Sequence, residues 1–261
     1  MKTYLCNHHK NRDSAQGFTI IELMIALVVL STILLIVTTA IMGMGNLYYK
    51  GQTVANTQNI TSSAFKEIIA NIEFSGNTPS LTNPNGQNNS SQCNTDIMWC
   101  SIYSSGSQAN VPVYAYCIGG IRYSFVINRE MVSSSAGSLI SSVYNQNPTY
   151  HALYEDQITG GSGCTPLDLL QPNPELGATE PGTNGRELLM PNMRLINFTI
   201  TQDPNTQAYD VTLSVAYGGD DVLSLTGSAP LGLQAKCLGT TGQQFCAVAT
   251  LSSSINMRIG D

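Results

Sequence analysis

One carboxylate lies at the head of a long apolar run, and it is the most informative chemical feature of this chain. Glu22 is the only charged residue between Phe18 and Met44. A membrane-spanning helix needs about 20 consecutive apolar residues, and this run exceeds that length. An ionisable group inside such a helix is energetically costly and usually has a dedicated partner. The sequence therefore predicts a membrane helix with a carboxylate whose partner must be identified.

The remaining polar residues form no catalytic constellation. A Ser-His-Asp site would have to use His151, and no nucleophile-elbow sequence lies near it. We therefore interpret His151 as a surface or core histidine. Glu155 and Asp156 are neighbouring carboxylates that would face opposite ways in a strand, and we interpret them as part of a solvated loop. The sequence also contains no P-loop, and we expect that the chain is not an enzyme.

Calcium is the one cofactor for which the sequence offers an argument. Asp203, Asn205 and Asp210 cluster around one predicted hairpin, and residues 220–221 add two more carboxylates after a glycine pair. Oxygen-rich loops of this kind can bind calcium. The spacing fits no EF-hand loop, and turns are commonly built from the same residues. We therefore expect no cofactor, with calcium near this hairpin as the alternative.

The stretch GFTIIELMIALVVLSTILLIV resembles the N-terminus of type IV prepilins and type II secretion pseudopilins. The resemblance extends roughly from Gln16 to Val37. It implies that a prepilin peptidase cleaves after Gly17 and that the new N-terminal residue, Phe18, is N-methylated. It also implies that Glu22 neutralises the N-terminal amine of a neighbouring subunit. A cation and a carboxylate that are each too costly alone in an apolar core become tolerable when paired.

Two other kinds of N-terminal segment remain as alternatives. One is an ordinary signal anchor with a stray glutamate. The other is a cleaved secretory signal, which has a 7–15-residue apolar region before the cleavage site, whereas here the apolar run is longer and follows Gly17. The expected leader, residues 1–17, holds three basic residues and one acidic residue, as expected for a cytoplasmic segment. It also holds Cys6, His8 and His9. These three residues could suggest a metal site, but we interpret them as part of a disposable leader.

Removal of the leader would make the chain more acidic. Basic residues fall from 11 to 8 and acidic residues from 17 to 16, so the formal net charge changes from −6 to −8. No basic patch of the kind that binds phosphates is present in the sequence. We therefore expect no bulk binding of nucleic acid.

Six cysteines follow the apolar run, and an even number in an exported domain predicts up to three disulfides. The shortest loops would be closed by Cys237–Cys246 and by Cys93–Cys100. Zinc is the competing interpretation, but the sequence has no Cys-x-x-Cys and only one histidine after the leader. The six candidates are Cys93, Cys100, Cys117, Cys164, Cys237 and Cys246.

After the apolar run, the spacing predicts that the helix continues to about Phe74 with one apolar face. Tyr48 and Tyr49 are placed to form an interfacial aromatic pair at the far membrane face. Farther along, apolar residues recur at helical spacing and require a packing partner. These residues are Ile60, Ala64, Phe65, Ile68, Ile69 and Ile72.

Strands are predicted to dominate from residue 97 onward. Residues 97–103, 111–118 and 121–128 are rich in β-branched and aromatic residues, and Gly119-Gly120 should form a tight turn between the last two. A further strand is possible within 131–144, while 75–96 and 157–185 have loop composition. Strict alternation at 196–200 and 209–217 predicts half-buried antiparallel strands, and 245–259 predicts a last one.

Together these patterns predict an α+β fold, in which a long N-terminal helix packs on an antiparallel β-sheet head. The expected organisation is a leader at 1–17, a helix at 18–75 whose first half spans the membrane, and a disulfide-containing globular head at 76–261. The stretch from Cys237 to Gly260 resembles the C-terminal end of the large minor pilins of the PilW type, relatives of the J pseudopilin. Only Arg258 stands where that group commonly has a basic pair.

The resemblance implies a minor pilin, a structural subunit of a type IV pilus that primes assembly or sits near the tip. Its partners would be other pilins, the prepilin peptidase and the inner-membrane assembly platform. It would be a single-pass inner-membrane protein with its head outside the cytoplasm, and later part of the surface fibre. A type II secretion pseudopilin is one alternative. A tip adhesin or DNA-capture subunit is another, in which the aromatic residues Trp99, Tyr103, Tyr114 and Tyr116 would line a binding face, although strands also use such residues in their core.

Overall fold

The computed structural model places two compact units along the chain, Met1–Asn46 and Leu47–Asp261. The described residues are 17–75, 99–105, 108–132, 148–158, 164, 166–167, 169–170, 175–176, 180–181, 185–203, 206, 208–227, 232–239 and 243–256. Residues 1–16 of the leader and most of the 75–96 and 131–144 segments lie outside these residues.

One helix, α1, runs from Ile20 to Phe74 without interruption, as the apolar pattern and its continuation predict. Its residues from 20 to 44 all have exposed side chains. Four hydroxyls in this stretch donate hydrogen bonds to backbone carbonyls three or four residues earlier, so each satisfies its polar atom within the helix. The helix is long and apolar enough to cross a membrane.

The part of α1 within the second unit buries one face. Ala64, Phe65, Ile68 and Ile72 are buried, as predicted, and Ile60 and Ile69 pack at the margin of the same core. Thr57 and Thr61 extend this face toward the N-terminus and are also fully buried. The hydroxyls of these threonines donate to the carbonyls of Thr53 and Thr57, so their burial leaves no unsatisfied donor.

A five-stranded antiparallel sheet has the order β1-β2-β3-β6-β9. The predicted turn at Gly119-Gly120 joins β2 to β3, and both glycines have positive φ, at 58° and 90°. A Cβ at Gly119 would also lie 2.8 Å from that of Ser75, so glycine is required there for space as well. The strands are β1 (Trp99–Ser105), β2 (Gln108–Ile118), β3 (Ile121–Phe125), β6 (Leu153–Gln157) and β9 (Arg186–Glu187).

A three-stranded antiparallel sheet is formed by β10 (Met193–Gln202), β11 (Tyr209–Tyr217) and β14 (Ala247–Ile255). The alternating residues of 196–200 and 209–217 lie in these strands, as predicted. An irregularity in the β10–β11 register between Leu195 and Asn197 shifts the alternation of β10 by one residue, so Phe198 and Ile200 lie in the same main core as Met193 and Leu195. The last strand begins two residues later than expected, because residues 243–245 form a 3₁₀ turn, η2 (Gln243–Phe245).

Three two-stranded pairs complete the described strands. The hairpin of β12 (Leu223–Thr226) and β13 (Gln234–Cys237) was not predicted, because its strands have only four residues each. A parallel pair joins β4 (Glu130–Met131) to β5 (Pro148–Thr149). The pair β7 (Glu175–Leu176) and β8 (Glu180–Pro181) lies in the segment expected to be a loop.

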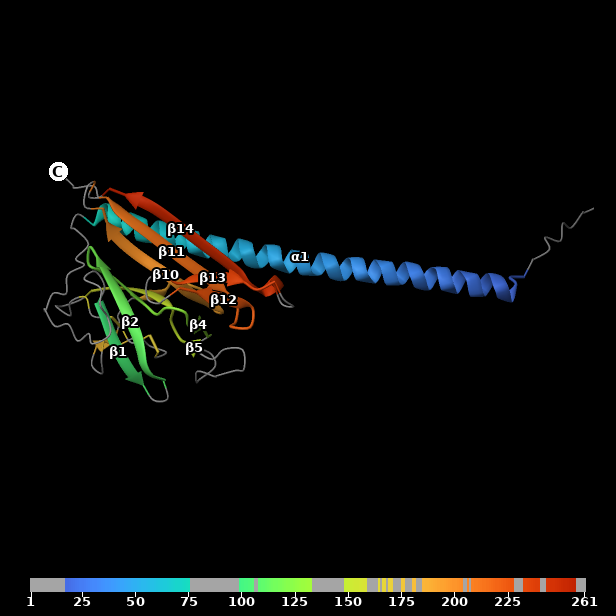
Figure 1. Cartoon of the computed structure of the whole chain (residues 1–261), viewed down its shortest axis with the longest axis horizontal. Helices are drawn as coiled ribbons and strands as arrows, with labels where there is room; N and C mark the ends of the chain where they lie inside the picture. The colour runs from blue at the N-terminus through green and yellow to red at the C-terminus, as the bar shows by residue number, and fades with distance from the viewer. Residues whose placement is uncertain are drawn as a thin grey trace, which may run out of the picture. The chain divides into compact units, whose positions relative to one another are not determined.

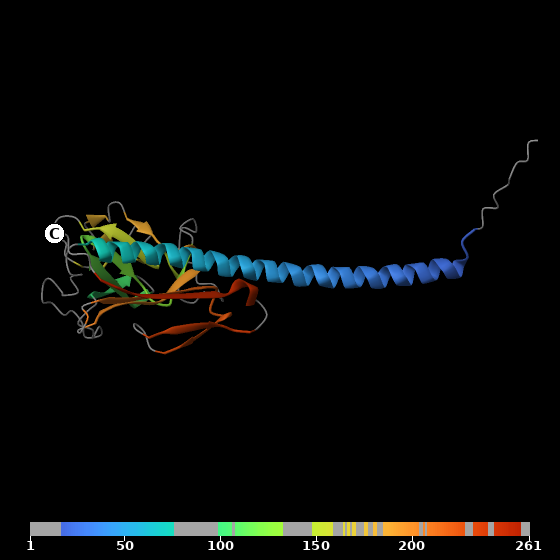
Figure 2. The same ribbon diagram turned by 90° about the horizontal axis from the view of Figure 1, so that it is seen from above.

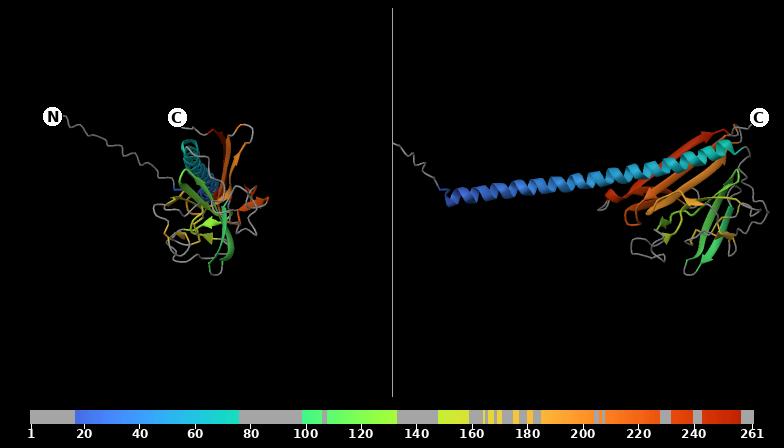
Figure 3. Two further views of the ribbon diagram at one scale, coloured as in Figure 1. Left: turned by 90° about the vertical axis from the view of Figure 1, so that its left-hand side faces the viewer. Right: turned by 180° about the vertical axis from the view of Figure 1, so that it is seen from behind.

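The second unit is organised around one main core in which the helix and both larger sheets meet. This core takes Phe65 and Ile68 from α1, Tyr123 from β3 and Phe198 from β10. Within this unit, β10, β11 and β14 run beside the helix, and β1 and β2 lie on the other side of β10 (Figure 1). Figure 2 shows the same layers from above, and Figure 3 shows them from the end and from behind. The predicted α+β architecture of one long helix and antiparallel sheets is confirmed.

Candidate functional site

The N-terminal end of α1 holds the residues that the sequence singles out for processing. Gly17, Phe18 and Thr19 precede the first helical residue and have no regular structure. The Phe18 side chain is 84% exposed. A peptide bond between Gly17 and Phe18 is thus presented in irregular backbone immediately before a helix.

The fold itself makes no demand for glycine at position 17. A Cβ added there would have no neighbouring atom within 4 Å, and the residue does not have a positive φ. A larger side chain could therefore be accommodated without strain in this chain. The requirement for glycine, if there is one, must come from another molecule that recognises this position.

Glu22 and Thr19 cap the helix reciprocally. Oε2 of Glu22 accepts hydrogen bonds from the backbone N–H and the hydroxyl of Thr19, each at 2.9 Å. In return, the backbone N–H of Glu22 donates to the Thr19 hydroxyl at 3.3 Å. This arrangement is a capping box, which satisfies two of the backbone donors that a helix start leaves open. The Thr-x-x-Glu spacing at residues 19–22 is the sequence signal for it, and the sequence analysis missed that signal.

The capping box holds one oxygen of the carboxylate and leaves the other available. Both donations from Thr19 go to Oε2, and no hydrogen bond to Oε1 is present among the described residues. The carboxylate is also placed in the first turn of α1, where the helix dipole favours negative charge. Glu22 is therefore held in place at an exposed helix start with room for a further donor.

Four of the six candidate cysteines form two disulfides in the described part of the chain. Cys237 is joined to Cys246, the pair expected to close a short loop, and Cys117 is joined to Cys164. The second bond ties β2 to a segment of the chain 47 residues farther on. Cys93 and the side chain of Cys100 lie outside the described residues, so their pairing stays a prediction.

The aromatic residues considered for a binding face divide into two groups. Tyr114 and Tyr116 are buried in the main core, where Tyr116 packs against Phe198 with ring centroids 5.0 Å apart. Burial raises the pKa of Tyr116 to about 12, although its hydroxyl accepts a hydrogen bond from the backbone of Ile200. The side chains of Trp99 and Tyr103 lie outside the described residues.

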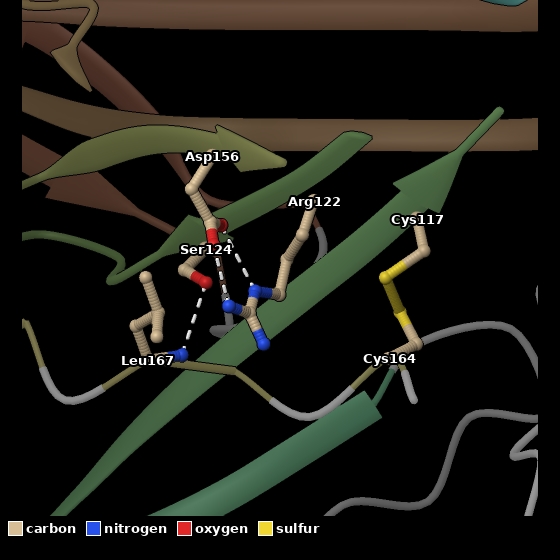
Figure 4. The surroundings of a disulfide bond; sticks show 6 residues. All are labelled: Cys117, Arg122, Ser124, Asp156, Cys164 and Leu167. Carbon is tan, nitrogen blue, oxygen red and sulfur yellow. Dashed lines mark hydrogen bonds and ion pairs between the residues drawn. A yellow bond between two sulfur atoms is a disulfide. The ribbon is translucent and has the colours of Figure 1, made fainter. Parts of the chain in front are cut away.

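The expectation that Glu155 and Asp156 lie in a solvated loop is wrong. Both belong to β6, and Asp156 is buried opposite Arg122 of β3. The guanidinium Nε donates to Oδ1 of Asp156 at 2.9 Å, and a second donation from the same group makes the pair bidentate (Figure 4). Beside the pair, the hydroxyl of Ser124 accepts a hydrogen bond from Leu167, which secures the segment after Cys164 over this face of the sheet.

A second buried cation connects three parts of the head. Arg194 of β10 is 1% exposed and donates to carboxylates of Glu130 and Asp220 and to the amide oxygen of Asn128. Burial of Glu130 raises its pKa, while the charge of Arg194 opposes this rise. These contacts are structural cross-links, because they join elements of the head and leave the arginine itself inaccessible.

Neither His151 nor the hairpin considered as an alternative calcium site belongs to a recognisable chemical centre in the described part of the chain. The Nδ1 atom of His151 lies 3.5 Å from Oε2 of Glu187, whose carboxylate accepts three backbone N–H groups. Asp203 accepts a hydrogen bond from Thr206, as a turn residue does, and Asn205 lies outside the described residues. No group of three or more His, Cys, Asp or Glu side chains that could hold a metal ion occurs among the described residues.

Comparison with known proteins adds one match. Residues 12–38 match the model of the prokaryotic N-terminal methylation motif. No curated protein and no solved structure matches the chain. The matched residues include Gly17, Phe18 and Glu22, and the segment ends within the exposed half of α1. This chain therefore carries the N-terminal methylation motif of prokaryotic prepilin-type proteins, which supports a place among type IV pilin-like or pseudopilin subunits.

Proposed function

We propose that the protein is a minor pilin, a structural subunit of a type IV pilus that has no enzymatic activity. It is cleaved after Gly17, N-methylated on Phe18 and held in the inner membrane by the first half of α1 until it enters the fibre. The observation that carries this proposal is the methylation motif at residues 12–38, which extends into a helix half whose apolar side chains are all exposed. Such a surface requires lipid or other helices around it.

Assembly would transfer the exposed helix half from lipid to a bundle of like helices. The capped Glu22 supports this step, because Oε1 can accept the Phe18 amine of a neighbouring subunit while Oε2 stays bound to Thr19. The pair would then neutralise two charges that are each costly in an apolar surrounding. The partners of this process are other pilins, the prepilin peptidase and the inner-membrane assembly platform.

The motif is equally compatible with a pseudopilin of a type II secretion system, which is the second candidate. The PilW-type resemblance of the C-terminal end and the size of the head favour a minor pilin that primes assembly or sits near the tip. A tip adhesin is less well supported, because Tyr114 and Tyr116 are used in the core and cannot line a binding face.

Processing is tested by mass spectrometry of the protein from membranes and from sheared fibres. The mature chain is expected to begin at a methylated Phe18, and Gly17→Val should leave the full-length mass. Gly43→Val is the matched control, because Gly43 also has open space around its Cα and lies within the helix. Cleavage of Gly17→Val at the same position and rate would refute this cleavage site.

Charge pairing is tested by comparing Glu22→Gln with Glu22→Ala. Glutamine preserves the acceptor of the capping box but removes the charge. If the carboxylate pairs with an amine, both variants should insert into the membrane and both should lose incorporation into fibres by at least tenfold, the factor that corresponds to about 1.4 kcal/mol. Normal incorporation of Glu22→Gln would show that capping, and not charge, is what assembly needs.

A further inference from the structure

Three aromatic rings form an exposed cluster in the second unit that core packing does not explain. Tyr48 and Tyr49 of α1 are 68% and 55% exposed, and Phe245 of η2 is 52% exposed. The ring centroids of Tyr49 and Phe245 lie 6.5 Å apart, and those of Tyr48 and Tyr49 lie 6.0 Å apart. Residues almost 200 positions apart in the sequence thus present one continuous aromatic surface, which we call the aromatic cluster.

The turn that carries Phe245 is fixed by a disulfide and by a close backbone contact. The next residue, Cys246, is 2% exposed and is bonded to Cys237 at the end of β13. Gly218, whose φ is +122°, passes so close that a Cβ there would lie 2.9 Å from the carbonyl oxygen of Phe245. An apolar ring displayed on a turn fixed by a disulfide and a close backbone contact is positioned to meet another surface.

Chain connectivity fixes how far this cluster can lie from the apolar half of α1. Tyr49 follows Met44, the end of the apolar run, by five residues within one continuous helix. Five helical residues extend about 7.5 Å along the axis. The headgroup region on each side of a bilayer is roughly 5–8 Å thick. If the run spans a membrane, Tyr49 lies at headgroup depth, and the Phe245 ring, whose centroid is 6.5 Å from that of Tyr49, lies within that distance of the same depth.

We propose that the aromatic cluster is a lipid-interface contact that seats the head on the bilayer before assembly. Tyrosine rings are enriched at membrane interfaces because they combine an apolar body with a polar tip. Lys50 follows the pair directly, and no acidic residue occurs between Glu22 and Glu67. In this arrangement, the Cys237–Cys246 loop holds the phenyl ring of Phe245 beside Tyr49 of α1 at the bilayer surface.

Ring insertion, more than charge, should drive this contact. The loop that packs on η2 carries Asp220 and Asp221, both exposed, which offset the attraction of Lys50 for anionic lipids. Asp220 is itself bound to Arg194. The contact should therefore form on zwitterionic phosphatidylcholine as well as on anionic phosphatidylglycerol.

The inference rests on the proposed membrane anchor and is tested with the full chain in vesicles. Phe245→Trp introduces a fluorescent ring into the cluster, and Phe74→Trp is the matched control, since Phe74 is 66% exposed and ends α1 25 residues beyond Tyr49. The native Trp99 contributes to both variants. Bromine-labelled acyl chains should quench the Phe245→Trp emission at least twofold more than that of Phe74→Trp.

Each other outcome overturns the inference in a recognisable way. Equal quenching of the two variants would place Phe245 away from lipid. Quenching that requires phosphatidylglycerol would replace ring insertion with charge attraction. A blue shift of Phe245→Trp that grows with protein concentration in detergent would identify a second copy of the chain as the occupant. Recovery of the unmodified chain apart from the vesicles would instead contradict the membrane anchor itself.

Discussion

The two compact units differ in where they place their apolar and charged side chains. The first unit exposes almost every apolar side chain that the structure describes in it, and its carboxylate, Glu22, is bound by its own Thr19. The second unit buries its apolar side chains and also buries charges, such as Arg122 with Asp156. The first unit is incomplete without an external apolar partner, while the second is satisfied internally. Substitutions should therefore affect insertion and assembly in one unit and the stability of the head in the other.

The largest effect on the head is expected from Asp156→Asn. It removes the carboxylate charge that faces the Arg122 guanidinium at 4% side-chain exposure, and breaking a buried ion pair costs ~3–5 kcal/mol. Urea unfolding of the full chain in detergent would measure the loss. Asp210→Asn is the control, because Asp210 is an exposed residue of β11. Loss of membrane insertion in Asp156→Asn, with an unchanged unfolding free energy, would break the contrast between the units.

A matched pair of isoleucines in α1 sharpens the contrast within a single helix. Ile68 is fully buried in the head, and its truncation to alanine should lower the unfolding free energy by ~2–5 kcal/mol. Ile33 is exposed, and Ile33→Ala should leave the unfolding of the head unchanged. Thermal unfolding followed by near-ultraviolet circular dichroism distinguishes the two. Equal shifts in Tm would mean that the first half of α1 contributes to the head after all.

The capping box predicts a smaller and local effect at the other end of the molecule. Thr19→Ala removes the side-chain acceptor of the first turn, and loss of such a cap costs ~0.5–2 kcal/mol. Amide hydrogen exchange should accelerate at residues 20–23 in Thr19→Ala and remain unchanged in the head. Thr38→Ala is the control, since that hydroxyl bonds only within the helix, to Leu34. Unaltered exchange at residues 20–23 would remove the cap as an explanation for the position of Glu22.

The smallest effect concerns the pH dependence of the head. Burial, and then the charge of Asp156, raise the pKa of Glu155 above its usual value of 4.5. The folded state therefore binds a proton more readily than the unfolded state, and the stability that Glu155 contributes falls as the pH rises from 4.5 through the raised pKa.

Glu155→Gln should remove this pH dependence of the unfolding free energy. The variant should be at least as stable as the unmodified chain at neutral pH, and the two should be equally stable near pH 4.5. Urea unfolding across this range measures it. Glu130, whose pKa is also raised, keeps its own slope in both proteins. A variant that is less stable at neutral pH would show that the ion pair of Glu155 with Arg186, at 3.5 Å, outweighs the cost of burial.

Periodicity explains which parts of the fold could be predicted. The apolar face at Ala64, Ile68 and Ile72 and the strict alternation in β11 are local patterns, and local patterns report burial directly. The glycine pair at 119–120 likewise encodes its own turn. By contrast, the β12–β13 hairpin has only four residues in each strand, which is too short to produce a clear pattern.

The buried charges could not be predicted because their partners are distant in the sequence. Arg122 and Asp156 are 34 residues apart and meet only through the register of β3 and β6. The same holds for Arg194 with Glu130, and for Phe245 with Tyr49. In the candidate site the opposite is true. Its residues lie within six consecutive positions, so the methylation motif could be recognised from the sequence alone. The Thr19–Glu22 cap could also have been predicted from its Thr-x-x-Glu spacing, but it was not.

The Cys117–Cys164 bond limits how far the head can be extended by force. If the chain were pulled from its two ends, the residues between these cysteines could be released only after the bond was reduced. The 47 residues that separate them correspond to about 160 Å of extended chain. An oxidised head under tension would therefore keep β3 and β6 inside a closed covalent loop, and it would lengthen by that much less than a reduced one.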